Sequence, residues 1–251
     1  MCGIIAAASE SDVVSTLLNG LYKMEYRGYD SAGLAIQDKN SIEHIRALGK
    51  VKKLEEKLLK TKPTSRLGIA HTRWATHGKP SEINAHPHKS SERIYIVHNG
   101  IIENHNQLKD FLKKEGYSFS SETDSEIIAH FLDYFLKQGK NIVDAIYKTK
   151  EKLNGAYAIA VIDKEDKKNI YLARNKSPLL IGLGKSENFA ASDILAIGET
   201  AESYIALEDG DVGVISSKDY KIYDHSKKQT ERKILKIESN LKSSDKGNYR
   251  H

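Results

Sequence analysis

The chain has 251 residues, of which 39% are hydrophobic and 29% charged, with a mean hydropathy of -0.53. This composition is typical of a soluble globular protein with one substantial core. No apolar run approaches the roughly 18 residues needed to span a bilayer. The first residues have neither the basic region nor the long apolar region of a secretory signal. We therefore expect no membrane association and no export.

Charge and cysteine content argue against several further kinds of binding site and cross-link. The formal net charge is +5, but the charges are interspersed, so we expect no nucleic-acid-binding face. The single cysteine, Cys2, excludes an internal disulfide and a thiolate-rich zinc site. A reducing cytoplasm is the expected compartment. Phosphate-binding glycine motifs are absent, so nothing in the sequence indicates nucleotide binding.

In the first part of the chain, the hydrophobic pattern predicts strands and helices in turn. A buried strand is expected over residues 2–8, followed by a helix capped by Ser11 or Asp12. Further strands are expected at 32–37, 42–48, 67–70 and 94–97, with a short basic helix around Leu54 to Leu59. Residues 71–93 are polar and read as a long loop, which is typical of a functional or mobile segment.

The second half predicts three helices and then strands. One helix begins at Asn104 and stops at Gly116, the next is capped by Thr123 and Glu126, and a third covers 141–153. Strands are expected at 157–162, 170–173, 179–183, 189–191 and 212–215. Strands, then helices, then strands favour an α+β fold with helices on the sheet faces. We expect one domain over 1–238 and the start of a linker at 239–251.

Cys2 directly follows the initiator methionine, and removal of Met1 would make it the N-terminal residue. Such a residue carries a thiol nucleophile and an α-amine with a pKa of about 7.7–8.0. The amine can accept the thiol proton directly or through one water. The alternative is a small hydrophobic residue that starts a strand.

Asn99 and Gly100 follow a predicted strand, where a side-chain amide and a backbone N–H can stabilise an oxyanion. Asn-Gly is also a common turn dipeptide. Asp124 is expected in the first turn of a helix, where simple capping is the alternative.

Arg73 lies just after a predicted strand and offers a bidentate fork for a carboxylate. Trp74, Thr76 and His77 stand beside it, and the two polar residues add hydrogen-bonding groups. The alternative is a surface arginine above a packed tryptophan. Seven of the ten histidines fall between His71 and His130. They lack the spacing of a metal-binding motif, so we expect no metal.

Five segments occur together in a recognisable order: MCGI at the start, EYRGYDSAG at 25–33, AHTRWATHG at 70–78, VHNGIIEN at 97–104 and SETD at 121–124. In these segments the chain resembles the glutaminase domains of glutamine–fructose-6-phosphate aminotransferases. These domains are class II glutamine amidotransferases with the N-terminal nucleophile (Ntn) hydrolase fold. The resemblance covers essentially the whole chain and implies a four-layer αββα sandwich.

The resemblance also implies residue roles. Cys2 would be the nucleophile and its α-amine the base, with Asn99 and Gly100 as the oxyanion hole. Arg73 would bind the glutamine carboxylate and Asp124 its ammonium group. The remaining roles would fall to Thr76 and His77 in the pocket, Trp74 on a closing loop, and Arg27 near Cys2.

The same resemblance implies that no cofactor is needed. It further implies a C-terminal sugar isomerase domain, absent from this chain, that converts fructose 6-phosphate to glucosamine 6-phosphate with the ammonia released, in a homodimeric enzyme. Three alternatives stay open: a different ammonia acceptor, a histidine-based metallohydrolase, and a non-catalytic partner-binding domain.

Overall fold

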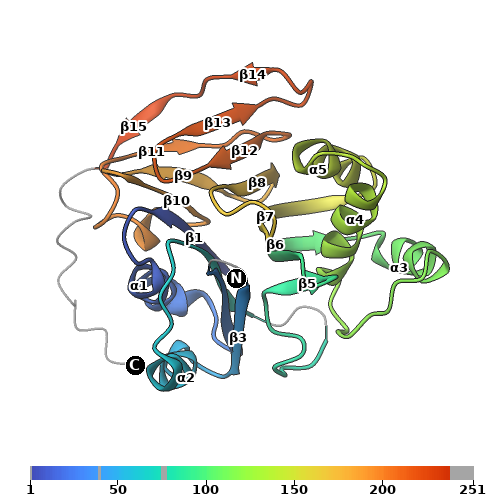
Figure 1. Cartoon of the computed structure of the whole chain (residues 1–251), viewed down its shortest axis with the longest axis horizontal. Helices are drawn as coiled ribbons and strands as arrows, with labels where there is room; N and C mark the ends of the chain where they lie inside the picture. Colours follow the sequence, from blue (N-terminus) through green and yellow to red (C-terminus); the bar gives the residue numbers. More distant parts are fainter. Residues whose placement is uncertain (1, 39–40, 75–77, 238–251) are drawn as a thin grey trace.

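Two antiparallel β-sheets lie face to face between two layers of helices (Figure 1). The computed structural model describes residues 2–38, 41–74 and 78–237. The predicted boundary at 238 and the predicted linker at 239–251 lie outside the described residues. No helix in the described ranges is long and apolar enough to cross a membrane.

Sheet A has the strand order β15-β11-β9-β10-β1-β4-β2-β3. Helices α1 (Val14–Met24) and α2 (Val51–Thr61) cover its outer face, together with the short 3-10 helix η2 (Ile194–Ala196). A second 3-10 helix, η1 (Glu25–Arg27), follows α1 directly. The strands are β1 (Gly3–Ser9), β2 (Ser31–Gln37), β3 (Ile42–Leu48), β4 (Leu67–Arg73), β9 (Leu180–Leu183), β10 (Glu187–Ala191), β11 (Ser203–Ala206) and β15 (Ile234–Lys236).

Sheet B has the strand order β14-β13-β12-β8-β7-β6-β5. Its outer face is covered by α3 (His105–Lys114), α4 (Glu126–Lys137) and α5 (Ile142–Lys150), which group on one side of Figure 1. The strands are β5 (His88–Ser90), β6 (Ile94–Ile102), β7 (Gly155–Asp163), β8 (Ile170–Asn175), β12 (Val212–Ile215), β13 (Tyr220–Tyr223) and β14 (Gln229–Thr230).

The alternation of side chains along each strand divides the apolar residues among three cores. In β1, Ile5 and Ala7 pack toward α1, whereas Ile4 and Ala6 face the other sheet. Strand β6, next to the edge strand β5, likewise presents Val97 to sheet A and its even-numbered neighbours to the helices. Because the inner strands are covered on both faces, β1 and β7 read as continuous apolar runs, whereas edge strands such as β3 are only partly buried.

The structure corrects several predicted boundaries. β4 continues to Arg73, β6 continues to Ile102, and residues 88–90 form β5, so the predicted 71–93 loop is much shorter. Four strands near the C-terminus were not predicted: β11, β13, β14 and β15. They are short and lie toward one edge of each sheet, and their pairing with neighbours defines them more than their own hydrophobic pattern does.

Two predicted helix caps are wrong. α1 has no side-chain cap, because the Asp12 carboxylate instead accepts the backbone N–H of Ser65 at 2.8 Å. α4 begins at Glu126 without a side-chain cap, and Glu126 accepts hydrogen bonds from Ser120 and Ser121. In both cases a carboxylate positioned for capping holds a neighbouring segment. The cap of α5 is regular, since Asn141 accepts the N–H of Asp144 at 2.9 Å.

Candidate active site

A cavity of about 350 Å³ opens where Cys2, directly before β1, meets the end of β4 and the end of β6. This volume lies at the lower end of the range for small-molecule sites, which suits a ligand the size of an amino acid. The lining residues are Cys2, Arg27, Arg73, Trp74, His86, His98, Asn99, Gly100, Ile101, Thr123, Asp124, Ser125, Ser177 and Pro178.

Strand alternation explains why Cys2 and Asn99 face each other. Cys2 has the same parity as Ile4, which faces sheet B, and Asn99 has the same parity as Val97, which faces sheet A. Both side chains therefore point into the space between the sheets. The Asn99 Nδ2 donates to the backbone oxygen of Cys2 at 3.1 Å, so the two sheets are joined at this point.

The Cys2 thiol is half-buried and lies against the backbone of Trp74. The Trp74 N–H donates to Sγ at 3.3 Å. Burial raises the pKa of the Cys2 thiol above its ordinary value, and the Trp74 hydrogen bond opposes that shift. The thiol is thus neutral at neutral pH, and its use as a nucleophile requires a base.

The sequence predicted that Asn99 and Gly100 follow the end of a strand. In the structure they instead lie within β6, opposite Ala158 and Tyr157. Gly100 has a φ of +138°, and a Cβ there would lie 1.9 Å from the Ala156 carbonyl oxygen. Only glycine fits this position. The strand therefore brings a side-chain amide and an exposed glycine backbone side by side at the cavity.

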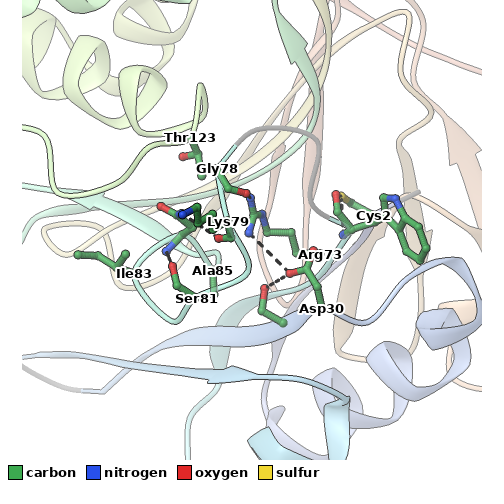
Figure 2. Close-up of polar contacts among 12 residues, drawn as sticks. Cys2, Asp30, Arg73, Gly78, Lys79, Ser81, Ile83, Ala85 and Thr123 are labelled. Atoms are coloured by element: carbon green, nitrogen blue, oxygen red, sulfur yellow. Dashed lines mark hydrogen bonds and ion pairs between the residues drawn. The ribbon is translucent and has the colours of Figure 1, made fainter.

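Arg73 is the last residue of β4, and its side chain is only 4% exposed. Its Nη2 donates to the Gly78 carbonyl oxygen at 3.1 Å, and its Nη1 lies 3.6 Å from the Asp30 carboxylate. Figure 2 shows the guanidinium between these two partners, with Cys2 close by. A cation fixed in this way at the cavity wall can bind a carboxylate.

Asp124 lies two residues before α4 begins, not in its first turn as the sequence predicted. Its Oδ2 accepts the Ile102 backbone N–H at 2.7 Å, which fixes the carboxylate at the cavity. Buried Glu126 holds the turn before it, since it accepts hydrogen bonds from Ser120 and Ser121. Burial raises the pKa of Glu126, but the contact with His130 and these hydrogen bonds outweigh that effect and lower it. Asp124 is thus a buried anion held by the backbone, on a wall of the same cavity as Arg73.

The remaining predicted residues fall into two groups. Arg27 lines the cavity, and its Nη2 pairs with the Asp193 carboxylate at 2.9 Å. Trp74 also lines the cavity and is 56% exposed. Thr76 and His77 lie outside the described residues.

The sequence did not predict several residues that line the cavity or hold its side chains in place. Asp193 holds Arg27, Asp30 faces Arg73, and His71 contacts Asn99. Ser177 and Pro178 reach the cavity from the segment between β8 and β9. Asp30 and His71 lie inside the motifs that carried the family resemblance, so those motifs were the available signal. Asp193, Ser177 and Pro178 had no local signal.

The histidines near the site form a buried cluster. His86 stacks on His71 with ring centroids 4.1 Å apart and contacts His88 at 4.5 Å. Burial lowers the pKa of His71 and of His88 to about 3. In the described part of the chain, no group of three or more His, Cys, Asp or Glu side chains could hold a metal ion. The cluster is therefore a set of neutral rings, of which His86 lines the cavity and His71 and His88 pack beside it.

The chain is similar in sequence to known glutamine amidotransferases. Residues 71–199, which are 129 of the 251 residues, match the glutamine amidotransferase domain family. The chain is 46% identical over its full length to a glutamine–fructose-6-phosphate aminotransferase [isomerizing] of Vibrio vulnificus (strain CMCP6) and 47% identical to the protein of that name from Haemophilus influenzae. It spans 41% of the length of each of these two relatives.

Solved structures share the fold at lower identity. The glutamine phosphoribosylpyrophosphate amidotransferase of B. subtilis has a TM-score of 0.77 and 23% identity, over 91% of this chain and 50% of that one. A glutamine aminotransferase class-II domain protein of Silicibacter pomeroyi has a TM-score of 0.61 and 16% identity, over 89% of this chain and 99% of that one. The predicted four-layer αββα sandwich of Ntn hydrolases is confirmed. Together with the match that covers just over half of the sequence, this shows that the chain belongs to the glutamine amidotransferase domain family.

Proposed function

We propose that this chain hydrolyses the side-chain amide of L-glutamine, with Cys2 as the nucleophile. The observation that carries the proposal is the meeting of Cys2 and Asn99 from two different sheets at one cavity. Arg73 and Asp124 line the same cavity. A thiol, an amide donor, a fixed cation and a fixed anion are the groups that a zwitterionic amide substrate requires.

The reaction follows from these groups. The Cys2 sulfur attacks the amide carbon, and a new C–S bond forms as the carbonyl oxygen takes the negative charge. The second N–H of the Asn99 amide and the Gly100 backbone N–H stabilise that oxyanion. The C–N bond then breaks, ammonia leaves with a proton from the protonated base, and water cleaves the γ-glutamyl thioester to glutamate.

The base is the α-amine of Cys2, freed by removal of Met1. Burial raises the pKa of the Cys2 thiol, so a neutral amine on the same residue is needed to take its proton. An amide nitrogen at this position has no useful basicity. In this mechanism, no metal or cofactor takes part.

Recognition of glutamine is divided between two walls of the cavity. Arg73 binds the α-carboxylate and Asp124 binds the α-ammonium group. We assign Thr76 and His77 to the same pocket, Trp74 to a loop that closes over the substrate, and Arg27 to organising the site near Cys2. Asp193 supports this last assignment, because its carboxylate fixes the Arg27 guanidinium.

We further propose that the ammonia is used by a longer protein. The relatives at 46% and 47% identity are named glutamine–fructose-6-phosphate aminotransferases, and this chain spans 41% of their length. In such a protein, residues 239–251 would begin the linker to a sugar isomerase domain that makes glucosamine 6-phosphate. A cytoplasmic homodimer is the assembly we expect. A different ammonia acceptor is the alternative.

Intact-mass measurement and a glutaminase assay on the same preparations test the mechanism. We expect activity to increase with the fraction of chains that lack Met1, and we expect Cys2→Ala to abolish it. Full activity in a preparation that retains Met1 would contradict the amine as base. A metallohydrolase would instead lose activity to a chelator while Cys2→Ala stayed active, and a non-catalytic domain would show no turnover in any preparation.

A further inference from the structure

His71 lies in β4, two residues before Arg73, and its side chain is fully buried. Like Arg73, it has the parity of Ile69, which faces sheet B. Its Nε2 lies 3.0 Å from two oxygen atoms, the backbone carbonyl of His98 and the Oδ1 of Asn99. Two acceptors at one ring nitrogen require that this nitrogen carry the proton. The His98 carbonyl therefore sets the tautomer of His71.

This tautomer determines how the Asn99 amide is oriented. The amide oxygen accepts from His71, and the amide nitrogen donates to the Cys2 backbone oxygen at 3.1 Å. The reverse orientation would place the amide N–H groups against the His71 N–H and the amide oxygen against the Cys2 oxygen. Both contacts would be repulsive, so only one orientation of the amide satisfies its surroundings.

We propose that His71 is a positioning residue that holds the Asn99 amide with its N–H groups toward Cys2. The inference rests on the proposed role of Asn99 as an oxyanion donor. A donor fixed before the reaction begins costs no reorganisation when the negative charge develops. His71 therefore acts on the transition state through Asn99 and makes no contact with the substrate itself.

Two features of the surroundings keep this arrangement constant. The ring of His71 packs against His86, with centroids 4.1 Å apart, which holds its plane. Burial lowers the pKa of His71 to about 3, so the ring stays neutral and its single N–H stays on Nε2 across the range in which the enzyme would work. Among the described residues, the other ring nitrogen has no hydrogen-bond partner, so no competing contact favours the second tautomer.

The test compares variants that keep or lose this donor in the 251-residue chain. His71→Phe keeps a ring without an N–H, and we expect kcat for glutamine hydrolysis to fall about 10- to 100-fold while KM changes less than about threefold. His71→Gln places an amide nitrogen near the position of Nε2 and should restore most of kcat. His71→Asn has the same chemistry on a shorter side chain, cannot reach Asn99, and should not.

His44→Phe is the matched control. His44 is also a neutral histidine in sheet A, and its Nε2 lies 2.8 Å from the Pro87 carbonyl oxygen. It contacts neither Asn99 nor Cys2 in the described structure. Its loss measures the cost of removing a histidine-to-carbonyl hydrogen bond, and we expect kcat to stay within about twofold of the unmodified chain. Reaction of Cys2 with iodoacetamide should be similar in all variants, because it does not use the oxyanion donor.

The decisive comparison is the effect of His71→Phe in the unmodified chain and in the Asn99→Ala variant. If His71 acts through Asn99, adding His71→Phe to Asn99→Ala should lower kcat less than about threefold further. Equal losses in both backgrounds, or equal kcat for His71→Gln and His71→Asn, would overturn the inference. The Gln and Asn variants decide the matter even if His71→Phe does not fold.

The same variants distinguish the oxyanion role of Asn99 from the positioning role of His71. If Asn99→Ala keeps full kcat, the proposed oxyanion role fails and the role of His71 fails with it. If Asn99→Ala loses kcat but His71→Phe behaves like His44→Phe, only the role of His71 is overturned.

Discussion

The Asn99 side chain joins Cys2 to sheet B at the cavity, because its Nδ2 donates to the Cys2 backbone oxygen. The same amide is the donor assigned to the oxyanion. Its position within β6, rather than in a turn, gives it a rigid support that a loop residue would lack. Its effect should therefore be on the transition state and not on substrate binding.

Asn99→Ala should lower kcat for glutamine about 10²- to 10³-fold, because one preorganised donor to the oxyanion is removed. KM should change much less. Steady-state kinetics on folded protein, verified by thermal unfolding, provide the measurement. An effect on KM alone would mean that Asn99 positions the bound substrate and does not stabilise the oxyanion.

Arg73 and Asp124 should control recognition without controlling the nucleophile. Arg73→Lys keeps the charge but loses the fork, and we expect a loss in kcat/KM of about 1.5–3 kcal/mol in transition-state free energy. Asp124→Asn keeps the size but removes the charge, and should also lower kcat/KM for glutamine.

Iodoacetamide provides the comparison for both variants, since it lacks the amino-acid end of glutamine and reports only on Cys2. Its reaction rate should change far less than kcat/KM in each variant. Parallel losses toward both reagents would show that these residues support the nucleophile or the fold instead of recognising glutamine.

At the scale of single elements, β6 carries Asn99 and Gly100 at the cavity and passes close to β7 at the same point. A Cβ at Gly100 would meet the Ala156 carbonyl oxygen at 1.9 Å, so a side chain there would push the two strands apart beside Asn99. The strand geometry and the active site are therefore coupled at one residue.

Gly100→Ala should lower both the free energy of unfolding and kcat. Gly139→Ala is the matched control, because Gly139 also has a positive φ, +80°, but nothing lies within 4 Å of its added Cβ. The control should cost only the backbone strain, about 1–2 kcal/mol, and leave kcat unchanged. Chemical denaturation and glutaminase kinetics measure the two quantities. Gly100→Ala with the same small cost as the control and full activity would contradict the predicted contact.

At the scale of the whole molecule, the fold buries a group of histidines in their neutral form. Burial is the first cause that lowers the pKa of each: to about 3 for His71 and His88, to about 4 for His44, and well below the ordinary value for His86. In the unfolded chain these residues would titrate near pH 6.5. Between the two values the unfolded state binds more protons, so stability falls as the pH decreases below about 6.5.

We expect the free energy of unfolding to decrease between pH 7 and pH 5, with a slope approaching about 1.4 kcal/mol per pH unit for each proton taken up. Carboxylates of the unfolded chain titrate mainly below about pH 4.5, so this window reports on the histidines. Urea denaturation at several pH values gives the slope. A free energy that is constant from pH 7 to pH 5 would show that the histidines are not buried as neutral rings.

The sequence by itself determined the class of fold and singled out seven of the fourteen residues that line the cavity. Apolar runs of strand length and helical spacing around Leu17, Phe131 and Ile146 predicted elements that the structure contains, because strand and helix periods are local properties. The motifs around Cys2, Asn99, Arg73 and Asp124 also singled out residues that line one cavity, although their catalytic roles stay a prediction.

Only the tertiary structure decided how those residues meet. Cys2 and Asn99 are 97 positions apart, and their contact depends on the packing of two sheets and on the parity of each strand. The Asp12 carboxylate binds Ser65, which is distant in sequence, and the Glu126 carboxylate binds Ser121 in the turn before α4. Local capping rules therefore assigned both carboxylates to the wrong partners. His71 and Asp193 contact residues that are distant in sequence, and no local pattern reports such a contact. The reason is physical: periodicity fixes which face a side chain takes, but the identity of its partner depends on which strands and loops pack opposite it.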